Sequence, residues 1–93
     1  MVNTIFTNNG SKNRCTGYTT VPYSSDADSE TVVETTEDDL ASIFEQAKAG
    51  GETLDGADSS IDAAIDDPLA FRDFLILDSD NSITFDSEYT RET

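Results

Sequence analysis

Histidine is absent from this chain of 93 residues, and cysteine occurs once, as Cys15. Without histidine, the chain has no imidazole base that could activate a serine or a cysteine nucleophile. Arg14 is the only neighbour in the sequence that would lower the pKa of Cys15. A lone cysteine also excludes an internal disulfide framework. We therefore expect no enzymatic activity, no catalytic residue and no cofactor.

Long apolar runs are also absent. No stretch approaches the roughly 18 to 20 consecutive apolar residues that a bilayer-spanning helix needs. The N-terminus lacks the charged-then-apolar pattern of a secretion signal. These absences predict a protein that has no membrane partner and that resides in the cytoplasm or in a virus particle.

Positive charge is scarce and unevenly placed. Five lysines and arginines stand against twenty acids, which gives a net charge of −15. All twenty acids lie at position 26 or later, so residues 1–25 carry +2 from Lys12 and Arg14, whereas residues 26–93 carry −17. Such asymmetry is typical of a chain in which one part meets a partner and the other stays in solvent. Two cations cannot sustain affinity for nucleic acid, so no direct binding to DNA or RNA is expected.

The acidic composition suits concentrated salt. Thirteen aspartates and seven glutamates occur with twelve threonines, ten serines and only two lysines. At about 1 M salt the Debye length falls to about 3 Å, and repulsion among exposed charges largely disappears. The composition therefore favours a halophilic cytoplasm, or a virus that grows in one. The alternative is an ordinary acidic protein of a mesophile.

Two helices are predicted. Residues 37–49 follow Thr36, which is a good N-cap, and they end at Gly50-Gly51. Their apolar residues recur with the helical spacing i, i+3, i+4, i+7. A shorter helix over residues 60–66 is predicted to begin at a serine cap and to end before Pro68.

A C-terminal hairpin over about residues 72–86 completes the predicted domain. Two apolar stretches, 74–77 and 82–85, flank the turn sequence Asp78-Ser79-Asp80-Asn81. A continuous helix over residues 68–77 is the alternative. Two helices and a hairpin predict an α+β fold in one small domain, which we place at residues 26–93.

Residues 1–25 are predicted to form an extended or loosely paired N-terminal arm. Two short strands flank an Asn-Gly turn signal, but Gly17 and Pro22 weaken the second strand. The segment has too little apolar bulk for its own core, and its cations are attracted to acidic surfaces. The residues predicted to bind a partner are Ile5, Phe6, Lys12, Arg14, Tyr18 and Tyr23. Docking on a neighbour and folding back on the same domain are equally compatible with the sequence.

Oxygen-bearing side chains recur at every second position from Asp78 to Glu88. A calcium loop of the EF-hand type needs glycine at its sixth position and a bidentate glutamate at its twelfth. The sequence has Ile83 and Tyr89 there. Alternation with a period of two is also typical of a half-exposed strand. We therefore expect no metal site.

An acidic stripe gives an alternative function. Asp58, Asp62 and Asp66 recur at i, i+4 and i+8, so on a helix they lie on one face about 6 Å apart. With Asp55, this surface has a charge spacing near that of successive phosphates, as in an inhibitor that mimics nucleic acid and occupies a basic DNA- or RNA-binding protein. An acidic face is equally what an amphipathic helix shows in any acidic protein.

The sequence thus predicts a structural or interaction protein that is not an enzyme and that binds a protein partner or assembles with itself. Docking is expected to occur through the N-terminal arm. The most concrete form of this hypothesis is an accessory component of a virion, such as a capsid-surface or connector subunit. A halophilic host would account for the acidity.

Overall fold

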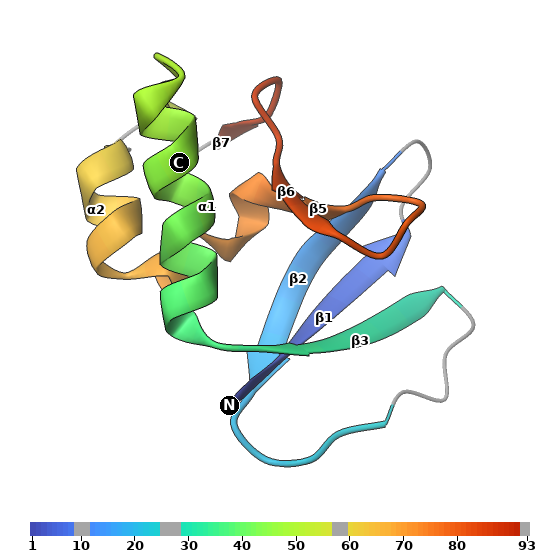
Figure 1. The fold of residues 1–93 in the computed structure, drawn as a ribbon. Helices are drawn as coiled ribbons and strands as arrows, with labels where there is room; N and C mark the ends of the chain where they lie inside the picture. Colours follow the sequence, from blue (N-terminus) through green and yellow to red (C-terminus); the bar gives the residue numbers. More distant parts are fainter. Residues whose placement is uncertain (9–11, 25–28, 57–59, 92–93) are drawn as a thin grey trace.

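The structure is a computed structural model that describes residues 1–8, 12–24, 29–56 and 60–91. Five antiparallel strands form a half-barrel sheet with the order β3-β1-β2-β5-β6, and the helices gather at one side of it (Figure 1). A second, two-stranded sheet pairs β4 with β7 in parallel. In chain order the elements are β1 (Val2–Asn8), β2 (Asn13–Thr19), β3 (Glu30–Thr35), α1 (Glu37–Ala49), β4 (Asp55–Gly56), α2 (Ile61–Asp66), the 3₁₀ helix η1 (Pro68–Phe74), β5 (Leu75–Leu77), β6 (Ile83–Phe85) and β7 (Thr90–Arg91).

The α+β class is confirmed, and α1 has the bounds predicted for the first helix. Thr36 has extended backbone angles, and its hydroxyl accepts a hydrogen bond of 3.1 Å from the Asp39 amide. Leu40 and Phe44 are fully buried, as the helical spacing of the apolar residues requires. The Gly50 amide closes the last turn by donating to the Ala47 carbonyl.

The second helix is confirmed with a start one residue later than predicted. Ser60 is the residue before α2, but its side chain makes no capping hydrogen bond. At Asp67 the backbone leaves the helical region, with φ −141°, as expected for a residue before proline. Pro68 then begins η1, where its missing N–H costs nothing.

The C-terminal hairpin is also confirmed. Leu75 pairs with Phe85 and Leu77 with Ile83, and the Asp78 amide donates to the Ser82 carbonyl across the turn. Asn81 supplies the positive φ of 66° that the turn needs. The alternative of a continuous helix is right only for its first part, because η1 ends at Phe74.

The first two strands differ from the prediction of an arm. β1 lies inside the sheet, paired with β2 on one side and with β3 on the other. Val2, Thr4 and Phe6 alternate along β1 and are buried, which gives this strand a full core-facing side. A register shift between Ile5 and Phe6 marks a bulge in the pairing with β2. Of the two arrangements that the sequence left open, folding back on the same domain is the one observed.

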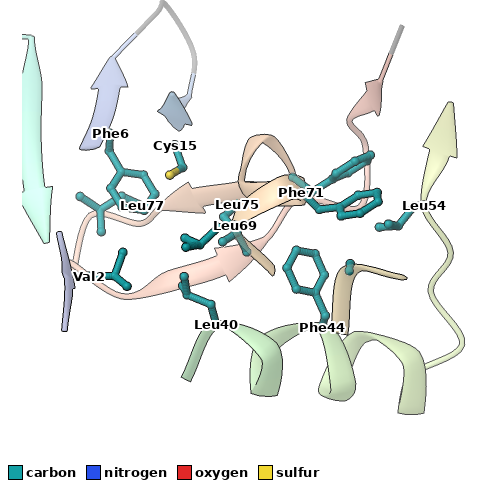
Figure 2. Close-up of a cluster of buried hydrophobic side chains, with 12 residues drawn as sticks. Val2, Phe6, Cys15, Leu40, Phe44, Leu54, Leu69, Phe71, Leu75 and Leu77 are labelled. Carbon is teal, nitrogen blue, oxygen red and sulfur yellow. The ribbon is translucent and has the colours of Figure 1, made fainter. Parts of the chain in front are cut away.

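One hydrophobic core joins the acid-free segment to the acidic remainder. Figure 2 shows Leu40 and Phe44 pointing from α1 toward the strands, with Phe6 and Cys15 at the opposite end of the same cluster. Phe74 lies at the centre of an aromatic group, 6.3 Å from Phe85 between ring centroids. The buried hydrophobic residues are Val2, Phe6, Cys15, Leu40, Phe44, Leu54, Ala64, Leu69, Phe71, Phe74, Leu75 and Leu77. The division at residue 25 is therefore a division of charge and not of packing.

None of the helices in the described ranges combines the length and the apolar character that a bilayer crossing requires.

The N-cap of α1 provides a direct test of this fold. We expect Thr36→Ala to lower the free energy of unfolding by about 1 kcal/mol, because the Asp39 amide loses its acceptor. Urea denaturation followed by circular dichroism measures this change. Ser60→Ala is the matched control, since Ser60 precedes a helix without making a capping bond. Equal losses in the two variants would contradict the assigned cap.

Candidate interaction surface

Asp86 forms the most connected polar site among the described residues. It follows β6 and is 4% exposed. One carboxylate oxygen accepts from Lys12 Nζ at 2.7 Å and from the Glu88 amide at 3.1 Å. The other accepts from Arg14 Nη2 at 2.9 Å. Both cations of residues 1–25 are thus bound to one carboxylate near the C-terminus.

Arg14 makes further contacts that fix its position. Its Nη1 donates to the Asp73 carbonyl at 2.9 Å. Its guanidinium carbon lies 4.0 Å from the centre of the Tyr89 ring, a distance typical of a cation–π contact. These contacts hold β2 against the end of η1 and the segment after β6. They also supply the largely buried Arg14 guanidinium with hydrogen-bond acceptors and a counter-ion.

The pKa of Asp86 reflects this environment. Burial alone would raise it, but the hydrogen bonds from Lys12 and Arg14 outweigh burial and hold the pKa below its usual 3.8. The same contact raises the pKa of Lys12. Because the folded-state pKa of Asp86 is depressed, its stabilising contribution is present above about pH 4 and is lost as pH falls through the lower folded value.

Three of the six residues predicted to bind a partner are used inside the domain. Lys12 and Arg14 bind Asp86, and Phe6 is completely buried. Phe6 therefore cannot contact a partner in this fold. The burial of Phe6 is indicated by the alternation of side chains along β1. The ion pairs join residues more than 70 positions apart in the sequence, and no local sequence pattern predicts them.

The other three keep exposed surface. Ile5 is half-buried on the side of β1 opposite Phe6. Tyr18 is 41% exposed, and its ring centre lies 5.2 Å from the Arg72 guanidinium carbon. Tyr23 is 40% exposed, and its hydroxyl donates to Glu30 at 3.5 Å. Whether they bind a partner stays a prediction.

The structure adds two exposed residues that the prediction omitted. Met1 is 72% exposed and Val21 is 64% exposed. Both residues lie just outside a strand, where side chains no longer alternate between the core and the solvent. This position next to a strand end is the sequence feature that could have predicted their exposure. All four large apolar or aromatic side chains found exposed in the described ranges come from residues 1–25; we call Met1, Tyr18, Val21 and Tyr23 the exposed apolar residues.

Met1 and Val21 lie at the same end of the sheet. The Val21 carbonyl accepts hydrogen bonds from Asn3 Nδ2 at 2.8 Å and from the Thr19 hydroxyl at 2.7 Å, which ties the segment after β2 to β1. A surface hollow lies beside Met1, between this end and the first turn of α1; its lining residues are Met1, Val2, Thr20, Thr36, Glu37 and Asp38. Apolar side chains thus border an acidic helix start.

The predicted mimic surface is only partly placed. Asp62 and Asp66 lie on α2 with exposed side chains, and Asp62 forms an ion pair with Lys48 of α1. Asp58 and the side chain of Asp55 lie outside the described residues. The structure therefore brings together two of the four aspartates, and one of these two is paired.

The alternating oxygen side chains after β5 each have a different role. Asp80 accepts from both the amide and the hydroxyl of Ser82, which closes the hairpin turn. Asp78 accepts from the Thr84 hydroxyl, and Asp86 is bound to its two cations. In the described part of the chain, no group of three or more acids or cysteines is arranged to hold a metal ion.

Cys15 is a core residue. It is 1% exposed, and burial raises the pKa of its thiol to about 11. Its Sγ lies 3.5 Å from the Gly17 carbonyl, to which it donates. Because the thiolate is the nucleophilic form, a thiol with this pKa is unreactive near neutral pH.

Comparisons of the chain with protein-family models, curated proteins and solved structures found no match.

Removing the charge of Asp86 tests the polar site. We expect Asp86→Asn to lower the free energy of unfolding at pH 7 by about 2 to 3 kcal/mol, because Lys12 and Arg14 lose their shared counter-ion. The difference from the wild type should shrink as the pH is lowered below 3.8, toward the lower folded-state pKa at which the Asp86 carboxyl becomes neutral. Urea titrations across this pH range measure both effects.

Asp66→Asn is the matched control, because it makes the same change of charge at an exposed position. We expect it to change the free energy of unfolding by less than about 0.5 kcal/mol. Similar losses in the two variants would show that the network of Asp86 does not stabilise the domain.

Proposed function

We propose that this chain is a structural or interaction protein without enzymatic activity, and that it docks on a protein partner through the exposed apolar residues of its acid-free segment. The observation that supports the proposal is their distribution: every large apolar side chain found exposed in the described ranges belongs to residues 1–25. Contiguous exposed apolar side chains often mark interaction sites, and Met1 and Val21 lie at the same end of the sheet.

The energetics favour such a contact. Covering a Val or Met side chain that is otherwise in water stabilises a complex by about 1.5 to 3 kcal/mol. Val21 and Met1 both retain most of their exposure in the free domain, so a partner that covers them gains this energy. Tyr18 and Tyr23 are of a type enriched at interfaces, since each offers an apolar ring with a polar tip.

The ion pairs of Lys12 and Arg14 determine the character of the partner. Since both cations already bind Asp86, they are not available to attract an acidic surface. The charges next to the hollow beside Met1 are Glu37 and Asp38, both exposed. The proposed partner therefore presents apolar side chains with basic residues around them.

The acidic remainder suits a subunit that joins one defined partner. Net charge far from zero keeps proteins soluble and discourages non-specific association. We propose, as the most concrete assembly, an accessory virion component such as a capsid-surface or connector subunit, and a halophilic host as the setting that fits the charge. Small size, acidity and the exposed apolar residues of the acid-free segment support this proposal.

Mimicry of nucleic acid is the alternative function. It receives less support, because Asp62 is paired with Lys48 and only Asp66 of the proposed stripe is placed as an exposed acid without such an ion pair. Binding that depends on carboxylates alone would fall steeply with salt, whereas apolar docking would not.

The apolar contact is tested by the double variant Val21→Ser, Tyr23→Ser in a pull-down of the partner from host extract. We expect recovery to fall by about ten-fold or more, because two of the four exposed apolar residues lose their apolar side chains. The variant Ser24→Ala, at an exposed polar position in the same segment and outside the lining of the hollow, is the control. Unchanged recovery at both low and high salt would remove the basis of the proposed function.

The salt setting is tested by measuring stability in KCl. We expect the free energy of unfolding to rise from dilute buffer to about 1 M KCl, where the Debye length is about 3 Å. A variant with Glu45, Asp66 and Asp67 changed to their amides should gain less, because it has fewer charges to screen. A stability that stays constant or falls with KCl would contradict a halophilic setting.

A further inference from the structure

β3 is the edge strand of the main sheet. It pairs with β1 along its whole length, from Glu30 opposite Thr7 to Thr35 opposite Val2. On its other side the sheet order shows no neighbouring strand within the described residues. Alternate residues of an edge strand present N–H and C=O groups that no strand satisfies, so they form a template for an added strand.

Residues 20–24 approach this edge without pairing with it. They leave β2 at the end of the sheet near the N-terminus (Figure 1). The Tyr23 hydroxyl donates to the carboxylate of Glu30, the first residue of β3. No backbone hydrogen bond joins residues 20–24 to residues 31–35, both of which the structure describes in full. Among the described residues, the outer edge of β3 from Thr31 to Thr35 therefore has no neighbouring strand, and Tyr23 lies at the start of β3.

The side chains of β3 define what the edge would accept. Val33 packs against the core, and its carbonyl accepts from the Thr4 hydroxyl, so Thr31, Val33 and Thr35 share the inner face. The opposite face of β3 carries Glu30, Val32 and Glu34 in that order, with Glu34 exposed. A strand added beside β3 would meet acid, apolar and acid positions in turn.

Charge complementarity selects the occupant. A second copy of the chain would bring two pairs of these glutamates together across the new ladder, and each copy carries a net charge of −15. Like charges on facing strands are destabilising, and opposite charges are stabilising. Acids on an edge also prevent pairing between identical edges. The edge of β3 is therefore unsuited to its own copy and complementary to a basic strand.

We infer that β3 accepts an extended segment of a basic protein, in which lysine or arginine alternates with apolar residues, as an added sixth strand. The backbone ladder supplies affinity, and the alternating face supplies specificity. This inference rests on the proposed function for the protein nature of the partner, and it adds the mode of binding and the chemistry of the segment.

The probe is a capped ten-residue peptide of alternating lysine and valine, titrated into the full ¹⁵N-labelled chain. We expect amide shifts concentrated in residues 30–35. A peptide of the same composition with N-methyl groups on its four central residues has the same charge but lacks the backbone donors. We expect it to bind about ten-fold more weakly, since it cannot complete the ladder. Equal affinity of the two peptides would overturn the inference, as would shifts that are absent or centred on α1 or α2.

Two variants separate pairing at β3 from general attraction to an acidic protein. Glu34→Lys and Glu45→Lys change the net charge equally at exposed positions, one on β3 and one on α1. We expect Glu34→Lys to weaken peptide binding by at least about five-fold and Glu45→Lys by less than about two-fold. Equal effects would show a non-specific electrostatic contact and overturn the inference.

The outcomes also separate this inference from the proposed function. One outcome is that the Val21→Ser, Tyr23→Ser variant loses the partner while Glu34→Lys and N-methylation leave the affinity for the peptide unchanged. In that case docking through the exposed apolar residues stands, and strand addition at β3 is wrong. If the partner is lost and the peptide tests succeed, both stand. If recovery of the partner is unchanged, the proposed function fails whatever the peptide does.

Discussion

The hydrogen-bonded ion pairs of Asp86 with Lys12 and Arg14 connect the two electrically distinct parts of this protein. Because these two are the only cations in residues 1–25, the whole positive charge of that segment is bound to one buried carboxylate. The same contact places Arg14 against Tyr89 and the end of η1. Removing one member would leave charge at a largely buried position, so the carboxylate and both cations act as a unit.

This use of charge changes what the surface offers to a partner. With Lys12 and Arg14 bound to Asp86, the exposed surface of residues 1–25 consists of apolar, aromatic and uncharged polar side chains, and all the acids belong to residues 26–93. Recognition would then combine a small apolar contact with selection by charge at its rim, an arrangement typical of protein interfaces. The acidic remainder limits association with other acidic molecules, including further copies of the chain.

The elements that the sequence predicted well are those with local signals. Thr36 and Gly50 delimit α1, and the turn from Asp78 to Asn81 sets the hairpin, because capping and turn residues act over a few positions. No local signal predicts the central position of β1, because that position depends on pairing with β3 across a connection of more than twenty residues. The roles of Lys12 and Arg14 could not be predicted for the same reason, because their ion pairs with Asp86 join distant parts of the chain.

The order of the strands also has a consequence for how the chain folds. β1, β2 and β3 are consecutive in the sequence and neighbours in the sheet, in the order β3-β1-β2, so their contacts span shorter separations than the contact between β2 and β5. This three-stranded unit joins the C-terminal hairpin through a ladder in which Arg14 is paired with Ile76, some sixty residues away. Contacts of such separation carry a larger closure entropy than those within the three-stranded unit, so we expect β2 to pair with β5 after that unit has formed.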